Sequence, residues 1–238
     1  TTDDGTIIER ECSNVFAVAN NLSSALPSSS MPLMKPMWVP SYPGSGAEMF
    51  RALVKATTGY NAETLYLYQA CSKPGVITCK THWPSIAKFR PQHPKKSIRR
   101  FHNRSFFLIR NPRNALPSYF NYFWEQRKRK KYHSQQAPLL DWQQWRNKNF
   151  HDQIYNWKNM ISNWTDTNTN PYQLIYIQYE KLTNKQTGPE LLENAIMNEL
   201  RQVSSLNNNN NDTNLIPCLW YKVIKGKESS KTKRATHK

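Results

Sequence analysis

The sequence predicts an α/β fold in three layers, with a central parallel sheet flanked by helices. Four short apolar runs have the character of strands, at residues 37–42, 76–80, 105–110 and 172–178. Stretches of helical periodicity separate these runs, which is typical of parallel strands whose connecting helices cover both faces of a sheet. The length of 238 residues suits one such domain.

The first strand runs into a turn and a helix. We expect this helix from about Gly46 to Thr58, with Gly59 as its C-cap, because glycine readily adopts the left-handed conformation that ends helices. The residues expected on its apolar face recur at helical spacing: Met49, Phe50, Leu53, Val54 and Thr57. The helix therefore begins where the strand ends.

The turn at residues 43–48 is suited to bind an anion, because turn amides converge at the positive end of the following helix. It is not a Walker A loop, since Ala47 and Glu48 follow Gly46 where that motif has Lys and Ser or Thr. This disfavours an ATP- or GTP-hydrolysing enzyme and a nucleotide kinase. An ordinary strand-to-helix turn would have a similar sequence, so this turn alone does not decide the function.

Arg110 ends the third predicted strand and leads into a second helix. Asn111 is a good N-cap and Pro112 a good first helical residue. Pro117 should kink the long helix that follows. Because a helix N-terminus and a guanidinium both attract anions, we expect Arg110 and the start of this helix to bind a phosphate.

Two more helices follow. Asp141 is expected to cap the first of them, whose mostly aromatic stripe we interpret as core packing: Trp142, Trp145, Phe150, Ile154, Trp157, Ile161 and Trp164. Gly188 and Pro189 open the second, which should reach about Val203. An asparagine run at residues 207–211 is expected to be a disordered loop.

We divide the chain into three parts. Residues 1–35 mix Ser, Asn, Pro and acidic residues without periodicity, which predicts a disordered linker or stem. Residues 36–225 form the folded domain, and residues 226–238 a basic tail. No apolar run is long enough to span a membrane, so a membrane link is expected only through an anchor upstream of this sequence.

The net charge of +17 favours anionic partners, among them nucleic acid, acidic glycans, membrane surfaces and nucleotides. Two basic groups could attract an acidic glycan, although solvated surface is an equal interpretation: residues 127–131, and Lys95, Lys96, Arg99 and Arg100. Neither group has interleaved aromatic residues, so single-stranded nucleic acid is disfavoured.

The four cysteines have no metal-ligand spacing, so no metal site is expected, and buried thiols or one or two disulfides stay open. Glycosylation sequons begin at Asn21, Asn103, Asn163 and Asn211, which weakly favours a secretory protein.

Three segments, residues 39–50, 76–84 and 110–118, taken in this order resemble the sulfotransferase superfamily. The resemblance covers roughly residues 37–182. The run Ser-Tyr-Pro-Gly-Ser-Gly at residues 41–46 is most similar to sulfotransferase-like proteins with WSC domains. The resemblance implies a P-loop-like domain that binds 3′-phosphoadenosine 5′-phosphosulfate (PAPS) and releases 3′-phosphoadenosine 5′-phosphate (PAP).

The same resemblance implies roles for individual residues. His82 would be the general base, which suits an imidazole, and Lys80 would stabilise developing charge. Arg110 and Ser118 would bind the 3′-phosphate, and Tyr179 would lie near the adenine. The loop for the 5′-phosphosulfate would consist of Gly44, Ser45, Gly46, Ala47 and Glu48.

The loop departs from the usual family pattern at several positions. Gly44 replaces a common lysine, and Ala47, Glu48 and Met49 stand where Thr or Asn, Thr, and Trp are usual. The carboxylate of Glu48 would repel phosphate unless it turned toward solvent or a neighbouring cation. Lys35 and Arg51 are the candidate replacement cations for the loop.

The sequence thus predicts a PAPS-dependent sulfotransferase that acts on an acceptor hydroxyl, with an acidic glycan as one candidate acceptor. The Golgi lumen or secretory pathway is the expected location, with the cytoplasm as the alternative. The rival hypotheses are a catalytically degenerate relative that binds a nucleotide or polyanion, and a nucleic-acid-binding protein.

Overall fold

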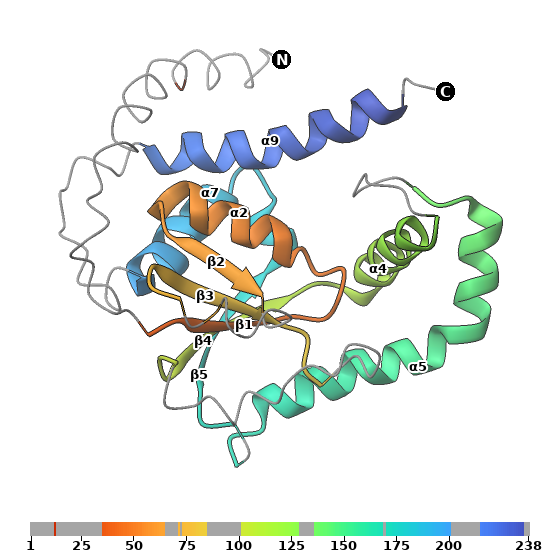
Figure 1. Cartoon of the computed structure of the whole chain (residues 1–238), viewed down its shortest axis with the longest axis horizontal. Coiled ribbons are helices and arrows are strands. Elements are labelled where there is room, and N and C mark those ends of the chain that lie inside the picture. Colours follow the sequence, from red (N-terminus) through yellow and green to blue (C-terminus); the bar gives the residue numbers. More distant parts are fainter. Residues whose placement is uncertain are drawn as a thin grey trace.

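A five-stranded parallel sheet forms the centre of the described part of the protein (Figure 1). The computed structural model describes residues 12, 35–64, 71, 73–84, 101–128, 136–168, 170–200 and 215–235. The strand order is β2-β3-β1-β4-β5, and every pairing is parallel. The strands are β1 (Met37–Pro40), β2 (Asn61–Thr64), β3 (Val76–Thr81), β4 (Arg104–Ile109) and β5 (Gln173–Gln178).

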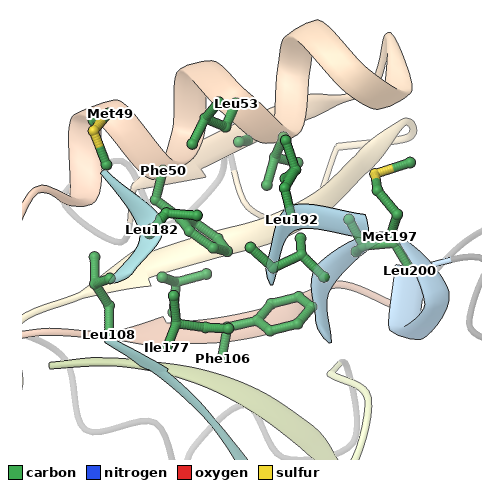
Figure 2. Close-up of a cluster of buried hydrophobic side chains, with 14 of the residues drawn as sticks. Met49, Phe50, Leu53, Phe106, Leu108, Ile177, Leu182, Leu192, Met197 and Leu200 are labelled. Atoms are coloured by element: carbon green, nitrogen blue, oxygen red, sulfur yellow. The ribbon is translucent and has the colours of Figure 1, made fainter. Parts of the chain in front are cut away.

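One face of the sheet is covered by a layer of helices, with a large apolar cluster beneath it (Figure 2). This layer contains α2 (Ala47–Thr58), α6 (Tyr179–Leu182), α7 (Gly188–Leu191), the π-helix η4 (Leu192–Met197) and α9 (Leu215–Ala235). The ring of Phe50 of α2 lies 5.6 Å from that of Phe106 of β4, Leu53 belongs to the same cluster, and all three are fully buried. Burying side chains of this size stabilises the layer by about 1.5–3 kcal/mol each.

The opposite face is covered by α4 (Pro112–Arg127) and α5 (Leu139–Thr165) (Figure 1). Trp38 of β1 and Phe107 of β4 pack there against Met160 and Trp164 near the end of α5. The sheet is thus sandwiched between two helical layers, which confirms the predicted α/β class.

The four predicted strands are present, and α2 has nearly the predicted bounds. Gly46 and Gly59 cap α2, both in the left-handed conformation, and the predicted apolar face is buried except for the partly exposed Thr57. Pro117 lies inside α4, which continues to Arg127. The helix opened by Gly188 reaches Leu200 as a run of α- and π-helical turns, and the remainder to Val203 lies outside the described residues.

The predicted cap of α5 is wrong. Pro138 occupies the N-cap position, and Asp141 lies in the first helical turn, where its carboxylate accepts a hydrogen bond from Trp124 Nε1 at 2.7 Å. The aromatic stripe is only partly core, because Phe150 is 44 % exposed while Trp164 is buried.

All four cysteines form disulfides, Cys12–Cys218 and Cys71–Cys79. The first ties the amino-terminal segment to α9. Apart from Cys12 and Lys35, the predicted stem lies outside the described residues, as do most of the two basic groups and the asparagine run. α9 continues across the predicted boundary at residue 225 to Ala235. No described helix has the length and apolar character needed to cross a bilayer.

Candidate functional site

The residues singled out in the sequence lie at the carboxyl ends of four neighbouring strands. Ser41 follows β1, His82 follows β3, Arg110 follows β4 and Tyr179 follows β5. Because the strands are parallel and β3, β1, β4 and β5 are adjacent, these residues share one edge of the sheet. Open α/β sheets generally bind ligands at that edge.

The loop between β1 and α2 contains two glycines that no other residue could replace without strain. Gly44 has φ +80°, and a Cβ there would lie 2.2 Å from the carbonyl oxygen of Ala115 in α4. Gly46 has φ +89°, and a Cβ there would meet the ring of Tyr179 at 2.2 Å. The loop is therefore held closely between α4 and Tyr179, and the lysine common in the resembled family would not fit at position 44 in this conformation.

The N-terminus of α2 has the character of an anion-binding site. Gly46 is its N-cap, and no side chain of the described residues caps it. Ser45 is 1 % exposed, and its Oγ has no hydrogen-bond partner among the described residues. A buried hydroxyl beside uncapped amides costs free energy unless a ligand or water binds it.

Gly44 is expected to tolerate no side chain. Gly44→Ala should lower the free energy of unfolding by at least about 2 kcal/mol, because it adds a backbone clash to the strain of a left-handed alanine. Gly75→Ala is the matched control: Gly75 has φ +75° but its added Cβ would meet nothing within 4 Å. Urea unfolding measures both variants, and equal losses would contradict the close packing of Gly44 on α4.

Glu48 turns toward cations, one of the two alternatives that the sequence left open. Its Oε1 lies 2.6 Å from Lys80 Nζ, and its Oε2 lies 2.8 Å from Arg51 Nη1. The pair with Lys80 crosses from α2 to β3, and the Lys80 side chain is only 10 % exposed. The carboxylate at the start of α2 is thus neutralised by two side chains.

His82 is buried and its proton is placed by the main chain. Nδ1 lies 2.5 Å from the carbonyl oxygen of Ser41, which can only accept, so Nδ1 carries the proton and Nε2 the lone pair. Burial and, to a smaller extent, the nearby Lys80 charge lower the pKa of His82 to about 3, although the Ser41 hydrogen bond and the Glu48 charge oppose the shift. His82 is therefore a neutral proton acceptor at physiological pH.

Arg110 connects the loop to the end of β5. Its Nη1 donates to the carbonyl oxygen of Gly44 at 2.6 Å, and its guanidinium lies over the Tyr179 ring, 4.1 Å from the centroid. The buried Nε has no hydrogen-bond partner among the described residues. The guanidinium is thus held against an aromatic face, and its Nε–H can still donate to a ligand.

The start of α4 agrees with the predicted cap but adds an unpredicted partner. Asn111 Oδ1 accepts a hydrogen bond from the Arg113 amide at 2.9 Å, and Pro112 is the first helical residue. Glu180 Oε1 accepts from the Asn111 amide at 3.1 Å. Ser118 lies half-buried on α4, beside the segment that contacts Gly44.

The motifs predicted from the sequence do share one sheet edge, but two contacts there were not predicted. The Ser41 carbonyl oxygen pairs with His82 Nδ1, and the Glu180 carboxylate accepts a hydrogen bond from the Asn111 amide. Arg51 was considered, and its spacing of three from Glu48 on one helix was the available signal. The described residues contain no cluster of three or more His, Cys, Asp or Glu suited to a metal ion.

No protein-family model, curated protein or solved structure matches this chain significantly.

Proposed function

We propose that this domain is a sulfotransferase that moves a sulfuryl group from PAPS to an acceptor hydroxyl, with an acidic glycan as one candidate acceptor. One observation carries the proposal: a neutral histidine, a lysine and the uncapped start of α2 share a sheet edge with an arginine stacked on a tyrosine. This combines a proton acceptor with two places for phosphate, as the chemistry requires.

The residues present fit the ligand. Ser45 Oγ and Arg110 Nε are buried polar groups without a partner in the described residues, and phosphate oxygens would satisfy both. The 5′-phosphosulfate would bind to the α2 amides, Ser45 and Lys80. Arg110 and Ser118 would hold the 3′-phosphate, and Tyr179 would border the adenine.

When bound, PAPS supplies an electrophilic sulfur and a phosphate leaving group, so the bond from acceptor oxygen to sulfur forms as the bond from sulfur to phosphate oxygen breaks. The protein provides the proton acceptor. His82 Nε2 receives the hydroxyl proton, and the Ser41 carbonyl oxygen holds the ring through Nδ1. Lys80 carries a positive charge against the negative charge that develops at the phosphate.

The test of this assignment is the affinity of PAP for an Arg110 variant. Arg110→Ala should weaken PAP binding roughly 30- to 1000-fold, because it removes charge-assisted hydrogen bonds worth about 2–4 kcal/mol in total. Arg113→Ala is the matched control, since Arg113 is an exposed arginine in the first turn of the same helix. Calorimetric titration measures both, and an equal affinity in the two variants would remove Arg110 from the ligand site.

A second function, nucleotide or polyanion binding without transfer, is favoured by one observation. A base whose pKa is lowered to about 3 accepts a proton from a hydroxyl weakly. This alternative predicts PAP binding without labelled product from PAPS in an acceptor screen, and labelled product that depends on His82 would exclude it.

We also propose that the domain folds in an oxidising compartment such as the Golgi lumen or another part of the secretory pathway, rather than in the cytoplasm. The support is that all four cysteines are paired. Thiol titration of protein isolated without reductant should find no free cysteine, and four titratable thiols would refute the proposal.

A further inference from the structure

Glu48 occupies the place where the proposed ligand would present its charge. It is the second residue of α2, so its carboxylate lies at the positive end of that helix. It also holds Lys80 Nζ at 2.6 Å. The carboxylate thus already makes two of the interactions expected for the 5′ anionic group, those with the helix end and with the lysine.

The two ends of this ion pair differ in exposure. The Lys80 side chain is 10 % exposed and fixed in the sheet, whereas the Glu48 side chain is 61 % exposed. An exposed carboxylate can leave its partner at small cost, because water replaces the lost contact. A ligand anion could therefore take Lys80 from Glu48 without disturbing the strand.

Arg51 can keep the Glu48 carboxylate paired after a ligand displaces it from Lys80. Its Nε donates to the carbonyl oxygen of Ala62 at 2.7 Å, and its Nη2 lies 3.9 Å from Glu63 Oε2, so β2 holds the guanidinium in position. Arg51 binds Glu48 through Oε2, not through the oxygen that contacts Lys80. Glu48 can thus release Lys80 and remain paired.

We infer, building on the proposed function, that Glu48 is a specificity-determining residue that competes with the ligand for Lys80 and so favours strongly anionic groups. A ligand gains from Lys80 when it offers more negative charge than one carboxylate does. Phosphosulfate, pyrophosphate and phosphate esters meet this condition, whereas carboxylate ligands do not. Adenosine 3′-phosphate lacks a 5′ anionic group and is not subject to the competition.

The test compares Glu48→Gln with wild type by calorimetry, using PAP, inorganic pyrophosphate and adenosine 3′-phosphate as probes. Glu48→Gln should bind PAP and pyrophosphate about two- to fivefold more tightly, the factor expected from removing a partly exposed ion pair. Adenosine 3′-phosphate should bind both proteins equally. Glu63→Gln is the matched control, because it removes the same charge from the other carboxylate near Arg51, and it should leave all three affinities unchanged.

The outcomes separate this inference from the proposed function. If Glu48→Gln gains no affinity for pyrophosphate or PAP, or if adenosine 3′-phosphate or Glu63→Gln shows the same gain, the inference is overturned. A separate titration of the wild-type protein with ADP that shows a preference for PAP over ADP would then still support the sulfotransferase proposal. A pyrophosphate gain in Glu48→Gln without any preference for PAP would support the inference and remove the sulfotransferase proposal. Absence of pyrophosphate binding in both proteins overturns the inference.

Discussion

Replacing His82 by asparagine should lower the rate of sulfuryl transfer about 10²- to 10⁴-fold, the usual contribution of a general base. Asparagine can keep a donor near the Ser41 carbonyl oxygen while it removes the Nε2 lone pair, so the loss should be confined to proton transfer. PAP affinity should remain close to that of wild type. Steady-state kinetics with labelled PAPS measures the first quantity and calorimetry the second.

The matched control is His102→Asn. His102 donates its amide to the carbonyl oxygen of Pro36, next to the start of β1 and thus at the opposite edge of the sheet. The His102→Asn variant should transfer sulfuryl groups at the wild-type rate. Unchanged turnover in His82→Asn would assign His82 a structural role only.

The second large effect is a loss of stability in acid. In the folded protein the pKa of His82 is lowered to about 3, while in the unfolded chain it is near 6.5. Between these pH values the unfolded state binds more protons than the folded state. The contribution of His82 to the free energy of unfolding is therefore fully present above pH 6.5 and is lost as the pH falls toward 3. From about pH 7 to about pH 4.5 the loss should be about 2–3 kcal/mol.

Urea unfolding of wild type and His82→Asn at the two pH values isolates this contribution. His102 adds to the acid sensitivity in the same direction, because burial and Arg104 lower its pKa. The variant should therefore keep a residual pH dependence smaller than that of wild type. Identical pH dependence in the two proteins would mean that His82 is not held neutral by burial.

The strand-to-helix connections could be predicted because their signals are local. Gly59, Asn111 and Pro112 each fulfil a geometric requirement at a helix end, and the structure has them in those positions. The apolar face of α2 likewise follows from periodicity alone. The order of motifs along parallel strands then places His82 and Arg110 at one sheet edge.

Two elements could not be predicted because tertiary contacts determine them. β2 is a strand of four mixed residues in which only Ala62 is buried, and pairing with β3 rather than propensity makes it a strand. Asp141 has the chemistry of a cap but binds the indole of Trp124, seventeen residues away. Side-chain preference alone did not distinguish these roles.

The contacts within the site could not be predicted from the sequence either. The sequence suggested that Glu48 turns toward solvent or a cation, but not that Lys80, 32 residues away, is a cation that it binds. The sequence also showed Gly44 in place of the common lysine, but it did not show why. The structure gives the reason, because Ala115 approaches position 44 too closely for a side chain. Such distances depend on how the loop packs, and no local pattern encodes them.

The most direct test of the central proposal is calorimetric titration of the wild-type domain with PAP and with ADP. PAP has its second phosphate on the 3′-oxygen, where Arg110 beside Gly44 and Tyr179 is proposed to bind it, whereas ADP has its second phosphate on the 5′-phosphate. Binding of PAP about 30-fold or more tighter than ADP is the predicted result, since one well-paired phosphate contributes about 2 kcal/mol or more. Equal affinity, or no binding of either ligand, would contradict the assignment of this sheet edge to PAPS.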